Sequence, residues 1–303
     1  MNKYEKYKDS GIEWIGVIPM SWASVSLKWI SKIYSGGTPS KNKPEYWQNG
    51  TIPWLNSGSV NQVFIKEPSE YITEDALANS SAKWIPSGSL VIALAGQGKT
   101  KGMVAQVLFD TTCNQSLGVI SPSPNLESRY LLYWLSKNYQ NIRFLGGGDQ
   151  RDGINLEMVG GIPIPLPSPP EQTAIANYLD HKTAEIDVLV ADKKRLLTLY
   201  EEEKTALINQ AVTKGIDPDV TLKDSGIEWL GEIPKHWVVK KLKHLTEIIS
   251  KGTTPSTVGK GTTSSGDVRF LKAENISNNL VKSHPENFID NETNKILSRS
   301  ELQ

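Results

Sequence analysis

A glycine- and lysine-rich stretch, "ALAGQGKTKG" at residues 93–102, offers the first chemistry that this sequence could perform. Glycines let backbone N–H groups approach an anion, and Lys99, Thr100 and Lys101 carry ammonium and hydroxyl groups that suit phosphate oxygens. The stretch resembles the phosphate-binding loop of nucleotide-binding proteins, but Ala93 stands where that loop has its first glycine. We therefore expect it to contact the phosphate backbone of a larger ligand rather than a bound nucleotide.

Other polar stretches mix lysine or arginine with short hydrogen-bonding side chains, which are the side chains that read base edges and hold phosphates. Arg151 suits a bidentate contact with guanine, Asn114 and Gln115 suit adenine, and the turn around Gly37 could present backbone N–H groups to phosphate. Solvated loops have the same composition, so a purely structural role stays open. The candidate DNA contacts in these stretches are Ser35, Gly37, Thr38, Lys41, Lys43, Asn56, Asn114, Gln115, Gln150 and Arg151.

Two short motifs indicate a different function, the methylation of adenine in DNA. "FLGGG" at 144–148 fits the F-x-G-x-G of methyl-donor binding but follows a predicted helix, where that motif follows a strand. "SPPE" at 168–171 lacks the aromatic residue that would end the catalytic motif and stack on a flipped base. The four histidines and Cys113 show no metal-ligand spacing. We expect no reaction centre, metal or cofactor, and keep a methyltransferase as the alternative.

The elements that must position these residues are mixed in type. "SLVIALA" at 89–95 and "SLGVISP" at 116–122 are apolar runs of strand length bounded by Gly, Ser and Pro. Residues 128–145 repeat apolar side chains at helical spacing. The expected fold class is α+β, with mixed α/β domains joined by a long coiled-coil-forming helix.

That long helix is predicted over 171–213, where neither proline nor glycine occurs. Ser168 can cap it, Glu171 and Gln172 suit the positive end of its dipole, and Lys214-Gly215 gives a stop. An apolar stripe at heptad spacing predicts a helical partner, unless the helix lies on its own domain. The stripe comprises Leu179, Ile186, Leu189, Leu196, Tyr200 and Leu207.

A long repeat organises the chain. "KDSGIEWIGVIPMSW" at 8–22 returns as "KDSGIEWLGEIPKHW" at 223–237, a constant offset of 215 residues. Solenoid repeats have periods of roughly 20–50 residues, so this period indicates two copies of a whole domain with a connector. The expected parts are a first domain at 1–165, a Pro-rich linker and long helix at 166–215, and a second domain at 216–303.

The composition of the chain limits the partners and the cellular compartment that we expect for it. The 33 Lys and Arg balance 33 Asp and Glu, so any attraction to nucleic acid must come from a local basic surface. The single cysteine, Cys113, cannot form an intramolecular disulfide, which fits a reducing compartment. No run approaches the ~18 apolar residues of a membrane helix, and the charged start is not that of a signal peptide. We expect a cytoplasmic protein without a membrane partner.

Taken together, these motifs resemble the specificity subunit of type I restriction-modification systems. The resemblance is carried by the repeated opening, "SGGTPS", "GQGKTKG", "TCNQSLGVI" and "GGIPIPLPSPPEQTAIANYLD". It implies two target recognition domains that each read half of a bipartite DNA sequence. It also implies conserved helices that dock the modification (methyltransferase) subunits, with restriction subunits in the same complex. Catalysis would belong to those partners and not to this chain.

The chain departs from that family pattern in its second half. The second copy ends at Gln303, where the alignment has reached only about Leu90 of the first copy. Either the sequence is a fragment or truncated gene, or it is a shortened subunit that completes itself as a homodimer through the long helix. Such a dimer would prefer two inverted copies of one half-site.

Overall fold

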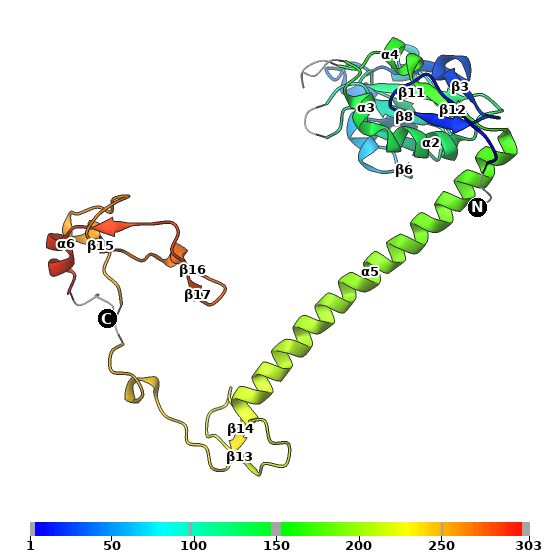
Figure 1. The fold of residues 1–303 in the computed structure, drawn as a ribbon. Coiled ribbons are helices and arrows are strands. Elements are labelled where there is room, and N and C mark those ends of the chain that lie inside the picture. Colours follow the sequence, from blue (N-terminus) through cyan, green and yellow to red (C-terminus); the bar gives the residue numbers. More distant parts are fainter. Residues whose placement is uncertain (1–3, 97–98, 147–152, 250, 299–303) are drawn as a thin grey trace. The chain divides into compact units, whose positions relative to one another are not determined.

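The structure, a computed structural model, describes residues 4–96, 99–146, 153–249 and 251–298. The chain divides into two compact units, residues 1–195 and 196–303. The boundary lies within one continuous helix, α5 (Pro169–Lys214), which is the green helix of Figure 1. Helices and strands are mixed, which confirms the predicted class. The proposed division into three parts at 165 and 215 stays a prediction.

A five-stranded sheet is the centre of the first unit. Strand β11 pairs antiparallel with β4 and β8, β8 pairs antiparallel with β9, and β6 adds parallel to β9. The two predicted strands are confirmed as β8 and β11, although β8 lacks Ser89, Leu94 and Ala95 of its predicted range and β11 lacks Ser116. In sheet order the strands are β4 (Ser31–Ser35), β11 (Leu117–Pro122), β8 (Leu90–Ala93), β9 (Val104–Val107) and β6 (Phe64–Ile65).

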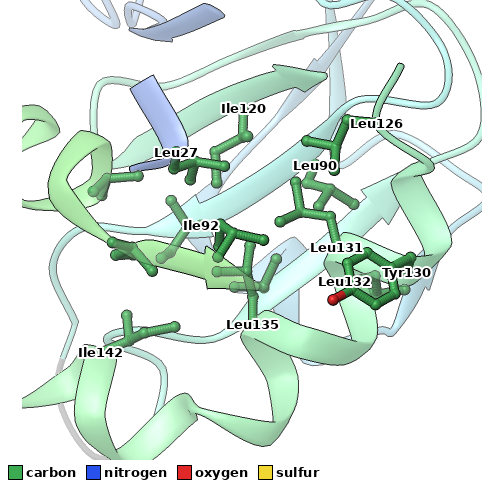
Figure 2. Packing of buried hydrophobic residues seen from close by; sticks show 14 of the residues in the cluster. Leu27, Leu90, Ile92, Ile120, Leu126, Tyr130, Leu131, Leu132, Leu135 and Ile142 are labelled. Atoms are coloured by element: carbon green, nitrogen blue, oxygen red, sulfur yellow. The ribbon is translucent and has the colours of Figure 1, made fainter. Parts of the chain in front are cut away.

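Two helices cover one face of this sheet, α2 (Ser128–Lys137) and α3 (Tyr139–Arg143). The prediction of one helix over 128–145 was wrong, because the buried Asn138 interrupts it. Its side-chain Nδ2–H donates to Trp134 O at 2.9 Å, so the amide competes with the helical backbone. Figure 2 shows the core beneath, where leucines of α2 meet aliphatic residues of the sheet: Leu90, Ile92 and Ile120 against Leu131, Leu132 and Leu135.

A smaller three-stranded sheet lies in the same unit. Strand β5 (Ile52–Leu55) pairs parallel with β10 (Thr112–Cys113) and antiparallel with β7 (Glu70–Ile72). Helix α1 (Glu74–Ala78) follows β7, and Thr73 Oγ1 caps it by accepting from Ala76 N–H. Trp54 and Ile72 are the buried centre of this part. The sheet places the end of β5 beside the end of β10.

Helix α5 begins where strand β12 (Pro163–Leu166) leaves its antiparallel partner β3 (Ala23–Ser26), and α4 (Leu156–Gly161) precedes β12. The predicted helix is confirmed. The Ser168 carbonyl accepts from the N–H groups of Glu171 and Gln172, and Gly215 leaves the helix at a φ of 80°. None of the described helices combines the length and the apolarity that crossing a bilayer requires.

The repeat is visible in the local structure of each unit. A hairpin of β1 (Tyr7–Asp9) and β2 (Val17–Pro19) opens the first unit, and β13 (Leu222–Asp224) and β14 (Glu232–Pro234) form the same hairpin 215 residues later with equivalent register. Asp9 and Asp224 each accept from the N–H two residues on, at 2.9 Å. The second unit also contains β15 (Val268–Arg269), β16 (Ile276–Ser277), β17 (Leu280–Val281), β18 (Phe288–Ile289) and α6 (Asn291–Ile296).

Candidate nucleic-acid interface

Three polar loops meet at one end of the five-stranded sheet. Ser35, the last residue of β4, pairs with Gly118 of β11. The preceding residue, Leu117, pairs with Ala93 at the end of β8, and Val104 at the start of β9 pairs with Ile92. The loops at 36–38, 94–103 and 114–116 therefore leave the sheet at the same end. Ile154 N–H also donates to Leu94 O at 2.7 Å, which brings a fourth segment to this end. Candidates far apart in sequence are thus collected on one side.

The loop at 36–38 is held tightly against the one at 113–115. Gly37 N–H donates to Cys113 O at 2.9 Å, and a Cβ on Gly36 would lie 2.0 Å from that oxygen. The glycines therefore permit close packing. This corrects the expectation for Gly37, because its N–H is used inside the protein and is not offered to phosphate. Thr38 Oγ1–H donates to Gln115 Oε1 at 2.6 Å, and both side chains reach the surface.

Asn56 and Asn114 lie beside each other, one just beyond each strand of the parallel β5–β10 pair. Asn114 N–H donates to Leu55 O at 3.0 Å. The side-chain oxygen of Asn56 accepts from Gly58 N–H at 2.8 Å, and that of Asn114 accepts from Ser116 N–H at 3.1 Å. Both oxygens thus stabilise turns, which leaves the NH2 groups as the donors that a ligand could use.

The lysine loop is anchored to α3 by residues that sequence reasoning missed. Tyr139 O–H donates to Lys99 O at 2.6 Å, and Arg143 Nη1–H donates to Lys101 O at 3.1 Å. Lys99 is exposed and Thr100 half-buried, whereas Lys101 is only 3% exposed. A direct phosphate contact by Lys101 would require the loop to rearrange, because its side chain is buried in this structure. Tyr139 and Arg143 stand one helical turn apart near the end of the predicted helix, and this spacing was the signal in the sequence that could have identified them.

A cavity of about 350 Å³ opens beside this loop. Its wall is mostly apolar, and Lys99 and Tyr139 line it from the loop and from α3. The full lining is Val60, Asn61, Val63, Lys99, Gly102, Met103, Val104, Ser136 and Tyr139.

Lys41 and Lys43 belong to the segment that leads into the three-stranded sheet. Lys41 Nζ lies 2.9 Å from Glu70 Oε2 and 3.4 Å from the centre of the Trp47 ring. Lys43 donates to the Tyr46 hydroxyl at 3.1 Å, and this hydrogen bond raises the pKa of the lysine. Both are exposed cations with internal partners, which DNA phosphates would have to displace or share.

The remaining chemical candidates are a buried thiol, the "SPPE" stretch and the possible metal ligands. Burial raises the pKa of the Cys113 thiol to about 12, so it is a poor nucleophile. Pro169 and Pro170 form the first turn of α5, and Tyr4 donates to the Glu171 carboxylate, so "SPPE" is a helix start. Within residues 4–96, 99–146, 153–249 and 251–298, no group of three acidic, His or Cys side chains could hold a metal. Gln150, Arg151 and the last glycines of "FLGGG" lie outside the described residues.

Helix α5 exposes the predicted apolar stripe. Ile186, Leu189 and Leu207 are more than half exposed, whereas Leu179, near the first domain, is half-buried. The exposed apolar set is wider than predicted. Besides the stripe residues Ile186, Leu189, Leu196, Tyr200 and Leu207, it includes Val188, Val190, Leu197, Leu199, Ile208 and Val212.

Gln172 attaches the start of α5 to the segment before α2, and Asp180 attaches it to α2 itself. Gln172 is fully buried, and its amide makes hydrogen bonds with Asn125 O, Pro167 O and Glu127 N–H. Asp180 accepts from Arg129 at 2.5 Å and from the Tyr133 hydroxyl at 2.7 Å. The first turns of the helix are therefore part of the folded unit.

Known proteins share this sequence pattern. The chain is 29% identical over 177 residues to the type I restriction enzyme EcoR124I/EcoR124II specificity subunit of Escherichia coli, covering 57% of this chain and 41% of that protein. It is 28% identical over 249 residues to the type I restriction enzyme MjaIX specificity subunit of Methanocaldococcus jannaschii, covering 80% and 55%. The chain thus spans about half the length of these relatives.

The fold is also shared with a solved chain. A protein studied for the complex assembly and conformational transition of a type I R-M system superposes with a TM-score of 0.54 at 18% identity, over 69% of this chain and 49% of that one. Residues 19–197 match the model of the family described as type I restriction modification DNA specificity domain. Because this match covers more than half of the chain, the chain belongs to that family, as its motifs predicted.

Proposed function

We propose that this chain is a sequence-specific DNA-binding specificity subunit of a type I restriction-modification complex. The observation that carries the proposal is the end of the five-stranded sheet, where Thr38, Lys99, Asn114 and Gln115 converge from three loops. Amide and hydroxyl groups held by the sheet suit base edges, and an exposed lysine in a loop at the same end of the sheet suits phosphate. Family membership supports the same function. The protein would act in the cytoplasm, where its DNA target lies.

The proposed target is bipartite, and this chain would read it by half-sites. The β13–β14 hairpin of the second unit has the register of the β1–β2 hairpin of the first, and the β15–β18 pair has the register of the β5–β7 pair. This correspondence supports two related recognition modules. Modules that share a scaffold and differ in their loops can read different bases.

The exposed side of α5 is the proposed docking surface for a helical partner. Apolar burial stabilises an interface by about 25 cal/mol per Å², so covering several leucine, isoleucine and valine side chains favours association. The partner would be a modification subunit or the α5 of a second copy, with restriction subunits joining through the complex.

The proposed role is recognition without catalysis, and calorimetric titration distinguishes it from the methyltransferase alternative. The full chain is titrated with S-adenosylmethionine and, separately, with a pool of randomised DNA duplexes. Recognition without catalysis predicts heat of binding for DNA and none for the methyl donor. Saturable binding of S-adenosylmethionine by the chain alone would contradict the proposal.

A further inference from the structure

The side chain of Gln115 is exposed, yet one atom of its amide is fixed. Thr38 Oγ1–H donates to Gln115 Oε1 at 2.6 Å, across 77 residues of sequence. Thr38 stands just beyond the end of β4 and Gln115 just before the start of β11. The hydrogen bond therefore joins two loops at the end of the sheet where the candidate DNA contacts gather.

The backbone on either side of both residues is also fixed. A Cβ on Gly36 would lie 2.0 Å from Cys113 O in β10, and a Cβ on Gly37 would lie 2.1 Å from Ser81 Oγ, so this segment has no room to shift inward. Backbone and indole groups tie the flanking residues to the strands: Asn114 N–H to Leu55 O (3.0 Å), Leu94 N–H to Ser116 O (2.9 Å), Gly37 N–H to Cys113 O (2.9 Å) and Trp54 Nε1–H to Gly37 O (3.1 Å). The exposed Gln115 amide thus stands on a rigid support.

The hydrogen bond leaves a defined set of groups for a ligand. A carbonyl oxygen has two lone pairs, so Oε1 can accept from Thr38 and from one further donor while Nε2 donates beside it. In the major groove adenine presents the N6–H2 donor next to the N7 acceptor, which complements this arrangement, whereas guanine presents two acceptors. Holding a long side chain in its bound orientation reduces the ordering cost of binding.

We propose that Thr38 is a positioning residue that orients the Gln115 amide to read one adenine in the target. The inference rests on the DNA-recognition function proposed above and deepens it by naming the base and the residue pair. Thr38 need not touch DNA, because it acts through Gln115. Thr38 and Gln115 together then set specificity at one position of the half-site.

The test selects duplexes from a randomised library with the full chain and then measures affinity for the selected duplex and its single-base variants. The wild type is expected to enrich an adenine position at which Gln115→Ala loses about 5- to 150-fold of its discrimination. Thr38→Val should lose about 2- to 10-fold at that same position, and Thr38→Ser, which keeps the hydroxyl, should restore it. In a Gln115→Ala background Thr38→Val should have no further effect.

Thr51→Val is the matched control, because Thr51 is exposed and precedes β5 at the end away from Asn56. It should leave discrimination unchanged, and Thr38→Val should melt at the wild-type temperature. A selected sequence that Thr38→Val reads as well as the wild type would overturn this inference alone. So would equal losses from Thr38→Val with and without Gln115. If the wild type enriched no sequence, the proposed function would fail, and this inference with it.

Discussion

Replacing Gln172 by leucine should release the start of α5 from the first domain. The side chain is fully buried and makes three neutral hydrogen bonds, to Asn125 O at 3.2 Å, Pro167 O at 3.0 Å and from Glu127 N–H at 2.8 Å. Each such bond contributes about 0.5–1.5 kcal/mol net, so their loss costs about 1.5–4.5 kcal/mol. Leucine has nearly the same volume, which keeps the cavity contribution small.

The assay is urea unfolding of the full chain followed by far-UV circular dichroism. Gln172→Leu should lower the free energy of unfolding of the first unit by about 1.5–4.5 kcal/mol, with little change in the urea dependence. Gln140→Leu makes the same chemical change at an exposed position of α3 and should stay within about 0.5 kcal/mol of the wild type. If Gln172→Leu were as stable as Gln140→Leu, the buried amide would not be what holds the helix.

Three further outcomes are expected. Lys99→Ala should weaken binding to all DNA sequences alike and reduce the salt dependence of log K by about one, because Lys99 is exposed. Lys101→Ala should instead lower the melting temperature, because Lys101 is buried. The reverse pattern would contradict the loop geometry. Cys113, whose pKa burial raises to about 12, should react with iodoacetamide at pH 8 at least about a hundredfold more slowly in the native protein than in urea; equal rates would show that the site is open. Light scattering of the full chain without its partners should report a dimer for the wild type and a monomer for Leu189→Asp combined with Leu196→Asp, because α5 exposes both leucines; a wild-type monomer at micromolar concentration would contradict self-association.

Much of the first unit could be predicted because its signals are local. The apolar runs that became β8 and β11 and the proline- and glycine-free stretch that became α5 depend on neighbouring residues only. The repeat likewise indicated two related domains, and the same hairpin occurs at the repeated sequence in both copies. The break at Asn138 escaped prediction, because an asparagine on a helical pattern gives no sign of whether its amide will bond to its own backbone.

The candidate site was predictable in composition but not in geometry. No neighbouring residue in the sequence indicates that Cys113 and Ser81 lie within contact distance of Gly36 and Gly37. Glycines that permit close packing were therefore interpreted as a phosphate-binding turn. Gln172 was expected only to suit the positive end of the helix dipole. Its buried hydrogen bonds were not predicted, because two of its partners lie 45 and 47 residues earlier in the sequence. Long-range contacts of this kind decide which side chains are buried and which remain available for a ligand.

We propose sequence discrimination on DNA by this chain alone. Its most direct test is the ratio of two affinities, measured by fluorescence anisotropy at physiological salt, for the selected duplex and for a duplex of the same composition in scrambled order. Specific recognition predicts a ratio of at least about a thousand, with the tighter affinity weakened about 5- to 150-fold when the adenine read by Gln115 is replaced. A ratio near one would contradict the account, because backbone electrostatics alone would then explain the binding.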